Sequence, residues 1–179
     1  FLDSNLYGIA VDLGSTTIAA HICNLSTGEI VNSSGIMNPQ IRFGEDLMSR
    51  VSFSMMNEDG TEKLKDAVQE TLNQLCKTLI KDSKIDHKLV VELSIVCNPV
   101  MHHLLLGINP IELGQAPFAL ATSNSLYFKS EELALNCLHN ATIFILPCIA
   151  GHVGADAAAV VLSEAPNESN ETVLIIDVG

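Results

Sequence analysis

Three apolar segments follow one another at the beginning of the chain, with no helical pattern between them. They cover residues 6–12, 18–25 and 30–37. A Ser-Thr-Gly-Glu turn of the kind that joins antiparallel strands separates the second segment from the third. Pro39 is expected to end the third segment, because proline disfavours regular structure on both sides. A doubly wound sheet would alternate strands and helices from the outset, so this beginning predicts an antiparallel meander instead.

Helices and strands alternate over the remainder of the chain. Apolar side chains recur at helical spacing after residue 44, Thr61 is a suitable N-cap, and Pro99 fits the first turn of a helix that Gly107 ends. Residues 89–96 form a nearly continuous apolar run, which is typical of a buried parallel strand. The expected elements are helices over 44–56 and 61–79, a strand over 89–96, a helix over 100–106, a loop with short helical pieces over 108–140, a strand over 142–146, a helix over 154–163 and a last strand over 172–178.

The order is therefore β-β-β-α-β-α-β-α with one further strand after it. This order predicts an α/β fold with a mixed five-stranded sheet, in which right-handed crossovers continue the meander and helices pack on the sheet. The 179 residues are enough for one well-buried core.

Charge and composition exclude several classes of function. The formal net charge of −12 argues against a nucleic-acid partner and against an anionic membrane surface, since both require Lys and Arg. No apolar run approaches the roughly 20 residues of a membrane helix. The five cysteines are scattered and never spaced as CxxC, which favours reduced thiols in a cytoplasmic protein over a disulfide framework.

The first apolar segment runs into Asp-Leu-Gly-Ser-Thr-Thr. Asp12 is expected at the carboxyl end of a strand, where ligands gather in open α/β sheets, and Gly14 lets the turn approach a phosphate closely. The N–H groups and hydroxyls of Ser15, Thr16 and Thr17 offer a concave donor surface for phosphoryl oxygens, and Asp12 would hold Mg²⁺ through water. The alternative is an ordinary hairpin turn in which Asp12 and Ser15 cap backbone groups.

A second apolar segment near the end of the chain also runs into an acidic residue and a glycine, here Asp177 and Gly179. An Ala-rich helix is predicted shortly before it, and small residues permit the close helix contact that a connector between two lobes requires. Two strand-to-turn elements of this kind can hold the phosphates and Mg²⁺ of a nucleotide between two lobes.

With these elements the chain resembles the first lobe of the actin, Hsp70 and sugar-kinase superfamily, which has a ribonuclease H-like fold. The similar strings are DLGSTT (12–17) for the first phosphate loop, GADAAAVVL (154–162) for the first connecting helix and IIDVG (175–179) for the start of the second phosphate loop. Longer strings resemble one branch, the ATP-dependent reductive activators of corrinoid proteins. They are MNPQIRFGEDLMSRV (37–51), CNPVMHHLLLG (97–107), PFALAT (117–122) and PCIAGHVGADAAA (147–159).

The resemblance implies an actin-like ATPase lobe over residues 1–165, followed over 166–179 by a linker and the first strand of a second lobe. It implies ATP and Mg²⁺ as cofactors, with Asp12 and Asp177 facing each other across a closed cleft to manage Mg²⁺. The phosphate-binding residues would be Gly14, Ser15, Thr16, Thr17 and Gly179.

The activity that the resemblance implies belongs to a larger parent protein. There ATP would drive electron transfer from an iron–sulfur cluster, located outside this chain, to cob(II)alamin on a partner corrinoid protein, which returns to the cob(I) state. The last strand, without a sheet of its own, would fray or add to a sheet edge in a second copy, which leaves a homodimer open. The residues are also compatible with a lobe of a small-molecule kinase of the same superfamily, and with a non-catalytic docking or dimerisation module.

Asp46 and Arg50 are spaced four residues apart at the start of a predicted helix, next to Arg42 and Glu45. This spacing favours a surface ion-pair ladder, and the alternative is a helix that faces a partner or the nucleotide cleft.

Four further residues have two interpretations each. His102 and His103 could indicate a metal, but adjacent residues on a helix point about 100° apart, which favours packing. For His152, a role at the start of a helix or in packing is weighed against one in the cleft. For Asp156, a capping or surface role is favoured over contact with Mg²⁺-bound water.

Overall fold

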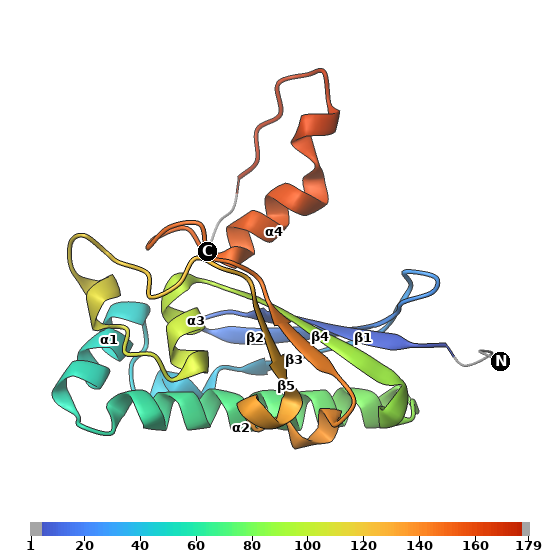
Figure 1. The fold of residues 1–179 in the computed structure, drawn as a ribbon, viewed down its shortest axis with the longest axis horizontal. Helices are drawn as coiled ribbons and strands as arrows, with labels where there is room; N and C mark the ends of the chain where they lie inside the picture. Colours follow the sequence, from blue (N-terminus) through green and yellow to red (C-terminus); the bar gives the residue numbers. More distant parts are fainter. Residues whose placement is uncertain (1–4, 177–179) are drawn as a thin grey trace.

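A six-stranded mixed sheet, in the order β3-β2-β1-β4-β6-β5, forms the centre of the computed structural model, which describes residues 5–176 (Figure 1). The strands are β1 (Tyr7–Leu13), β2 (Thr17–Asn24), β3 (Ile30–Met37), β4 (Val90–Cys97), β5 (Leu126–Lys129) and β6 (Thr142–Ile145). The α-helices are α1 (Leu47–Met56), α2 (Gly60–Asp82), α3 (Pro99–Leu106) and α4 (Ala155–Glu164). Six 3₁₀ helices complete the described elements: η1 (Pro39–Arg42), η2 (His87–Leu89), η3 (Ile111–Gly114), η4 (Ser130–Leu133), η5 (Asn136–Leu138) and η6 (Pro166–Glu168).

The sheet changes from antiparallel to parallel at β1. This strand pairs with β2 in antiparallel register, with Asp12 opposite Ala19, and with β4 in parallel register, with Asp12 opposite Val96. β3 continues the antiparallel meander beyond β2, and β6 continues the parallel part beyond β4. The predicted α/β class and mixed sheet are therefore confirmed.

The sheet has one strand more than the five predicted. The additional strand, β5, lies in the segment that the sequence assigns to a loop. The sequence does not reveal it, because a strand of four residues forms by pairing with β6 and has no clear pattern of its own. Residues 172–176 of the last predicted strand, 172–178, form no strand, as expected of a strand that frays without a sheet of its own. Val173, Leu174 and Ile176 are exposed there and pair with no strand of residues 5–176, and residues 177–178 lie outside the described part of the chain.

The helix ends follow local hydrogen bonds. α1 begins at Leu47, three residues later than predicted, and its N-cap Asp46 accepts a hydrogen bond from the Ser49 amide at 2.7 Å. Thr61 is not an N-cap, since α2 begins at Gly60 after Asp59. The predicted bounds of α3 are confirmed: Asn98 caps it, Pro99 opens it and Gly107 ends it with a φ of 69°.

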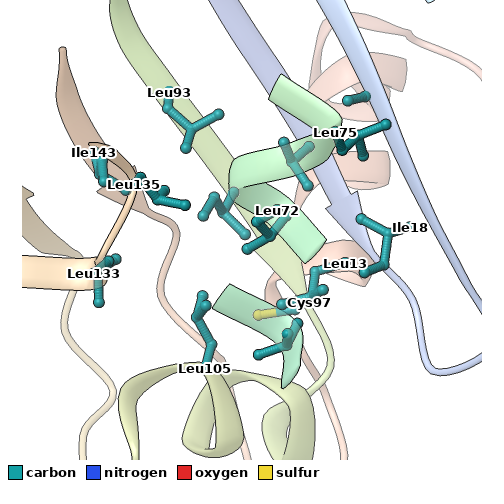
Figure 2. Close-up of a cluster of buried hydrophobic side chains, with 14 of the residues drawn as sticks. Leu13, Ile18, Leu72, Leu75, Leu93, Cys97, Leu105, Leu133, Leu135 and Ile143 are labelled. Carbon is teal, nitrogen blue, oxygen red and sulfur yellow. The ribbon is translucent and has the colours of Figure 1, made fainter. Parts of the chain in front are cut away.

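The core lies on one face of the sheet, under α1, α2 and α3. Along β1, β2 and β4 alternate side chains are buried, as in a sheet with one covered face, so β4 is not buried on both faces as its apolar run predicts. Figure 2 shows Leu72 and Leu75 of α2 in the same cluster as Leu13, Ile18 and Leu93 of the sheet. The opposite face is open except where α4 begins, and from there α4 extends away from the sheet (Figure 1).

Both histidines of α3 are buried by packing. The Ala121 amide donates to Nε2 of His103 at 3.1 Å, so Nδ1 carries the proton and donates to the Pro99 carbonyl at 2.8 Å. The ring nitrogens of His102 have no hydrogen-bond partner among the described residues. Within residues 5–176 no group of three or more His, Cys, Asp or Glu is arranged to hold a metal ion. The same residues contain no helix with the length and hydropathy that a membrane crossing requires.

Leu72 gives a test of the core. It is fully buried on α2, so Leu72→Ala leaves a cavity between α2 and the sheet and should lower the free energy of unfolding by about 2–5 kcal/mol. Chemical denaturation measures this loss. Thr78→Ala, at an exposed position of the same helix, is the control and should change the free energy by less than about 0.5 kcal/mol. Equal losses in the two variants would contradict the packing described.

The buried histidines predict a loss of stability in acid. Burial, with a smaller effect from His103, lowers the pKa of His102 to about 4, and burial also lowers the pKa of His103. The unfolded chain therefore takes up protons below about pH 6.5 that the folded protein does not bind. The free energy of unfolding should fall from there toward about pH 4, by about 1.4 kcal/mol per pH unit for each such proton.

Denaturation curves at several pH values measure this slope. His102→Gln should flatten it, whereas His139→Gln, at an exposed position, should leave it as in the unsubstituted protein. A slope that does not change in His102→Gln would show that this ring is not responsible.

Candidate functional site

The loop between β1 and β2 is held to the protein by its carbonyl groups. Asn38 donates from its side chain to the Gly14 carbonyl at 2.9 Å and from its backbone to the Thr16 carbonyl at 2.8 Å. Arg50 donates from Nη2 to the Ser15 carbonyl at 2.6 Å. Three successive carbonyls are therefore bound by the interior of the protein.

This arrangement decides where the amides of the loop point. In a trans peptide the N–H of one residue points opposite to the C=O of the residue before it. The N–H groups of Ser15 and Thr16 are therefore directed away from Asn38 and Arg50, which gives the loop two successive donors on its outer side. Gly14 is required here, because a Cβ at this position would lie 2.5 Å from the Thr17 carbonyl oxygen.

A hollow of about 1060 Å³ lies between the open face of the sheet and α4. Its wall on the loop side contains Gly14 and Ser15. The sheet contributes alternate residues of β1 and β4 that point away from the core, and α4 forms the remaining wall. These lining residues include Ala10, Asp12, Ser94 and Val96 of the sheet and Asp156, Ala159, Val160 and Ser163 of α4.

Two carboxylates, Asp12 and Asp156, enter the hollow from different elements. Asp12 is exposed near the end of β1, and Asp156 lies in the first turn of α4. Asp156 also accepts a hydrogen bond from the Ala157 amide in the first turn at 2.8 Å, although the N-cap of α4 is Gly154 and not Asp156. Carboxylate oxygens and backbone amides are the groups that bind Mg²⁺ and phosphate, respectively.

The position of α4 depends on Gly154, the residue before the helix. A Cβ on Gly154 would lie 2.6 Å from both the Asn98 Cα and the Cys97 carbonyl oxygen. The start of α4 therefore meets the end of β4 backbone to backbone, which places the wall of the hollow that carries Asp156.

The structure brings together some of the predicted site residues and not others. Asp12, Gly14 and Ser15 line the hollow, whereas Thr16 lies beside Asp46 and Leu47 of the α1 region in an adjoining depression that shares Ser15 and Leu47 with the hollow. Thr17 is exposed at the start of β2 and pairs with Met37. Asp177 and Gly179 lie outside the described residues. His152 does not line the hollow, since its ring packs on Phe118 with the centroids 4.2 Å apart.

The predicted surface ion pair between Asp46 and Arg50 is wrong. Arg50 is fully buried and its guanidinium donates to acceptors other than Asp46. The Asp46 carboxylate accepts the Ser49 amide instead, and this hydrogen bond holds the pKa of Asp46 below its usual value. Spacing alone could not reveal this, because the same i, i+4 pattern is compatible with an exposed or a buried arginine.

The cysteines do not form a cluster site. All five carry free thiols, and burial raises the pKa of Cys76 and Cys97 well above the usual range, which leaves them protonated. The described residues of this chain therefore do not fit an iron–sulfur cluster.

Two known proteins are similar to the chain over nearly its whole length. The corrinoid activation enzyme RamQ of Eubacterium limosum is 32% identical over 184 residues, which cover 100% of this chain and 31% of that protein. A solved structure described as a reductive activator for corrinoid, iron-sulfur protein matches with a TM-score of 0.89 and 29% identity, over 96% of this chain and 27% of that one.

This chain spans less than a third of the length of either relative. The structural match agrees with the mixed α/β, actin-like lobe that the sequence predicts, apart from the strand count. The family model of the RACo middle region matches residues 7–167. The chain therefore belongs to the RACo middle region family.

Proposed function

We propose that the hollow binds the phosphates of ATP with Mg²⁺, and that the chain supplies one side of the ATP site of a corrinoid activator. The observation that carries the proposal is the loop after β1. Its Gly14 and Ser15 carbonyls are tied to the interior, so that the Ser15 and Thr16 amides point outward, and Gly14 and Ser15 line the same hollow as Asp12. Such amides are suited to phosphoryl oxygens.

The residues have separate tasks in this proposal. The loop amides and the Ser15 hydroxyl hold phosphoryl oxygens, with Thr16, Thr17 and Gly14 as part of the same loop. Asp12 orients the water ligands of Mg²⁺, which usually keeps most of its hydration shell. Asp156 joins it from α4, because both line the hollow. Asp177 and Gly179 remain the predicted counterparts on the second lobe.

In this proposal the nucleotide controls the activity by stabilising either the open or the closed arrangement of two lobes. Bound ATP supplies phosphate charge that two lobes can share, and a partner protein responds only if it binds the open and closed arrangements with different affinity. The relatives' names, corrinoid activation enzyme and reductive activator, support a corrinoid protein as that partner. The electron transfer returns cob(II)alamin to cob(I), with the iron–sulfur cluster in another part of the parent protein.

Asp12→Asn in the full-length protein tests the site. Without the carboxylate the affinity for ATP with Mg²⁺ should fall about tenfold or more, which corresponds to at least about 1.4 kcal/mol, and corrinoid reduction should slow. Affinity for adenosine, which has no phosphate, should not change. Calorimetry measures the binding, and the absorbance of the corrinoid measures its reduction.

Asp82→Asn removes the same charge at an exposed position at the end of α2 and should behave as the unsubstituted protein does. Unchanged ATP binding and corrinoid reduction in Asp12→Asn would refute the assignment of Asp12. Transfer of the γ-phosphoryl group to a small molecule, without any effect on a corrinoid protein, would favour a small-molecule kinase instead.

A further inference from the structure

Arg50 is the largest fully buried side chain among the described residues. It projects from α1 and donates to groups on four other parts of the structure. The acceptors are the Gly44 carbonyl at 3.0 Å, Gln40 Oε1 at 3.3 Å, Met101 Sδ at 3.2 Å and the Ser15 carbonyl at 2.6 Å. The shortest of these hydrogen bonds is to the phosphate-binding loop.

All four acceptors are uncharged. Within residues 5–176 no carboxylate forms an ion pair with Arg50, although fully buried arginines are usually paired with one. Burial lowers the pKa of Arg50, and a weaker effect from Asp46 raises it. An arginine nevertheless keeps its proton in a protein, so the positive charge of Arg50 remains in the interior without direct contact to a carboxylate of residues 5–176.

The location of this charge indicates which anion balances it. The guanidinium contacts the carbonyl of Ser15, and the next amide, of Thr16, points the opposite way, toward the outer side of the loop. An anion held by the loop amides would therefore lie across one peptide group from the buried charge. Asn38 holds the neighbouring Gly14 and Thr16 carbonyls without carrying a charge.

We propose that Arg50 is the positioning residue of the phosphate-binding loop, which fixes the Ser15 carbonyl inward and whose buried charge is balanced by the phosphates of the nucleotide. The inference rests on the proposed function and adds a residue that does not itself touch the ligand. It requires that the contribution of Arg50 to the binding affinity increase with the number of phosphates on the nucleotide. A side chain that only supported the fold would affect all nucleotides alike.

The test compares ligands of increasing charge in the full-length protein. Calorimetry gives the affinities of adenosine, AMP, ADP with Mg²⁺ and ATP with Mg²⁺ for Arg50→Met, which removes the charge, and for Arg50→Lys, which keeps it. In Arg50→Met the affinity for ATP should fall roughly 10- to 100-fold, the range expected for loss of a charge-assisted interaction. The loss should be smaller for AMP and absent for adenosine, and Arg50→Lys should recover most of the affinity for ATP.

Gln69→Leu is the matched control. Gln69 is a buried side chain of α2 that donates to the Leu105 carbonyl at 2.9 Å, away from the loop, so its removal costs stability without changing nucleotide affinity. Thermal unfolding without ligand measures the stability of every variant. If Arg50→Met fails to fold, Arg50→Gln takes its place, because it keeps a donor but loses the charge.

Two results would overturn the inference while leaving the proposed function intact. In the first, ATP binds to the charge-free variant as tightly as to the unsubstituted protein. In the second, adenosine and ATP lose affinity by the same factor. If the unsubstituted protein binds no ATP, both the proposed function and this inference fail.

Discussion

The arrangement of the molecule depends on the hydrogen bonding of β1 on both of its edges. β2 pairs with one edge in antiparallel register and β4 with the other in parallel register, and a shift of β1 by one residue would reverse which of its side chains enter the core. With this register fixed, Val11 and Leu13 lie under the helices, and Asp12 between them lies on the open face. The same constraint that builds the core therefore places the carboxylate and the loop that follows it.

Much of this could be predicted from the sequence, because the relevant signals are local. The meander, the start of α3 at Pro99 and its end at Gly107 follow from turn and capping residues next to each element. β5 could not be found in this way, since four residues become a strand only when β6 lies alongside them. The apolar run before Asp177 has a strong strand pattern, but no partner strand in the described part of the chain pairs with it.

The candidate site was predictable to the same limited extent. The Asp-Leu-Gly-Ser-Thr-Thr string identifies the loop. The structure explains why glycine is needed at position 14, since the Thr17 carbonyl leaves no room for a Cβ there. The support behind the loop was not predictable, because Asn38 and Arg50 are distant from it in sequence and reach it only after β3 and α1 are in place. Asp156 likewise gains its place in the hollow from the packing of α4.

Gly154 constrains the base of the wall formed by α4 more tightly than the remainder of that wall. The helix starts at a close backbone contact with the end of β4, and its first residue, Ala155, is fully buried, so this point of attachment tolerates little added volume. Substitutions further along α4, where the side chains are half-buried or exposed, can change the lining and the width of the hollow while the pivot stays in place.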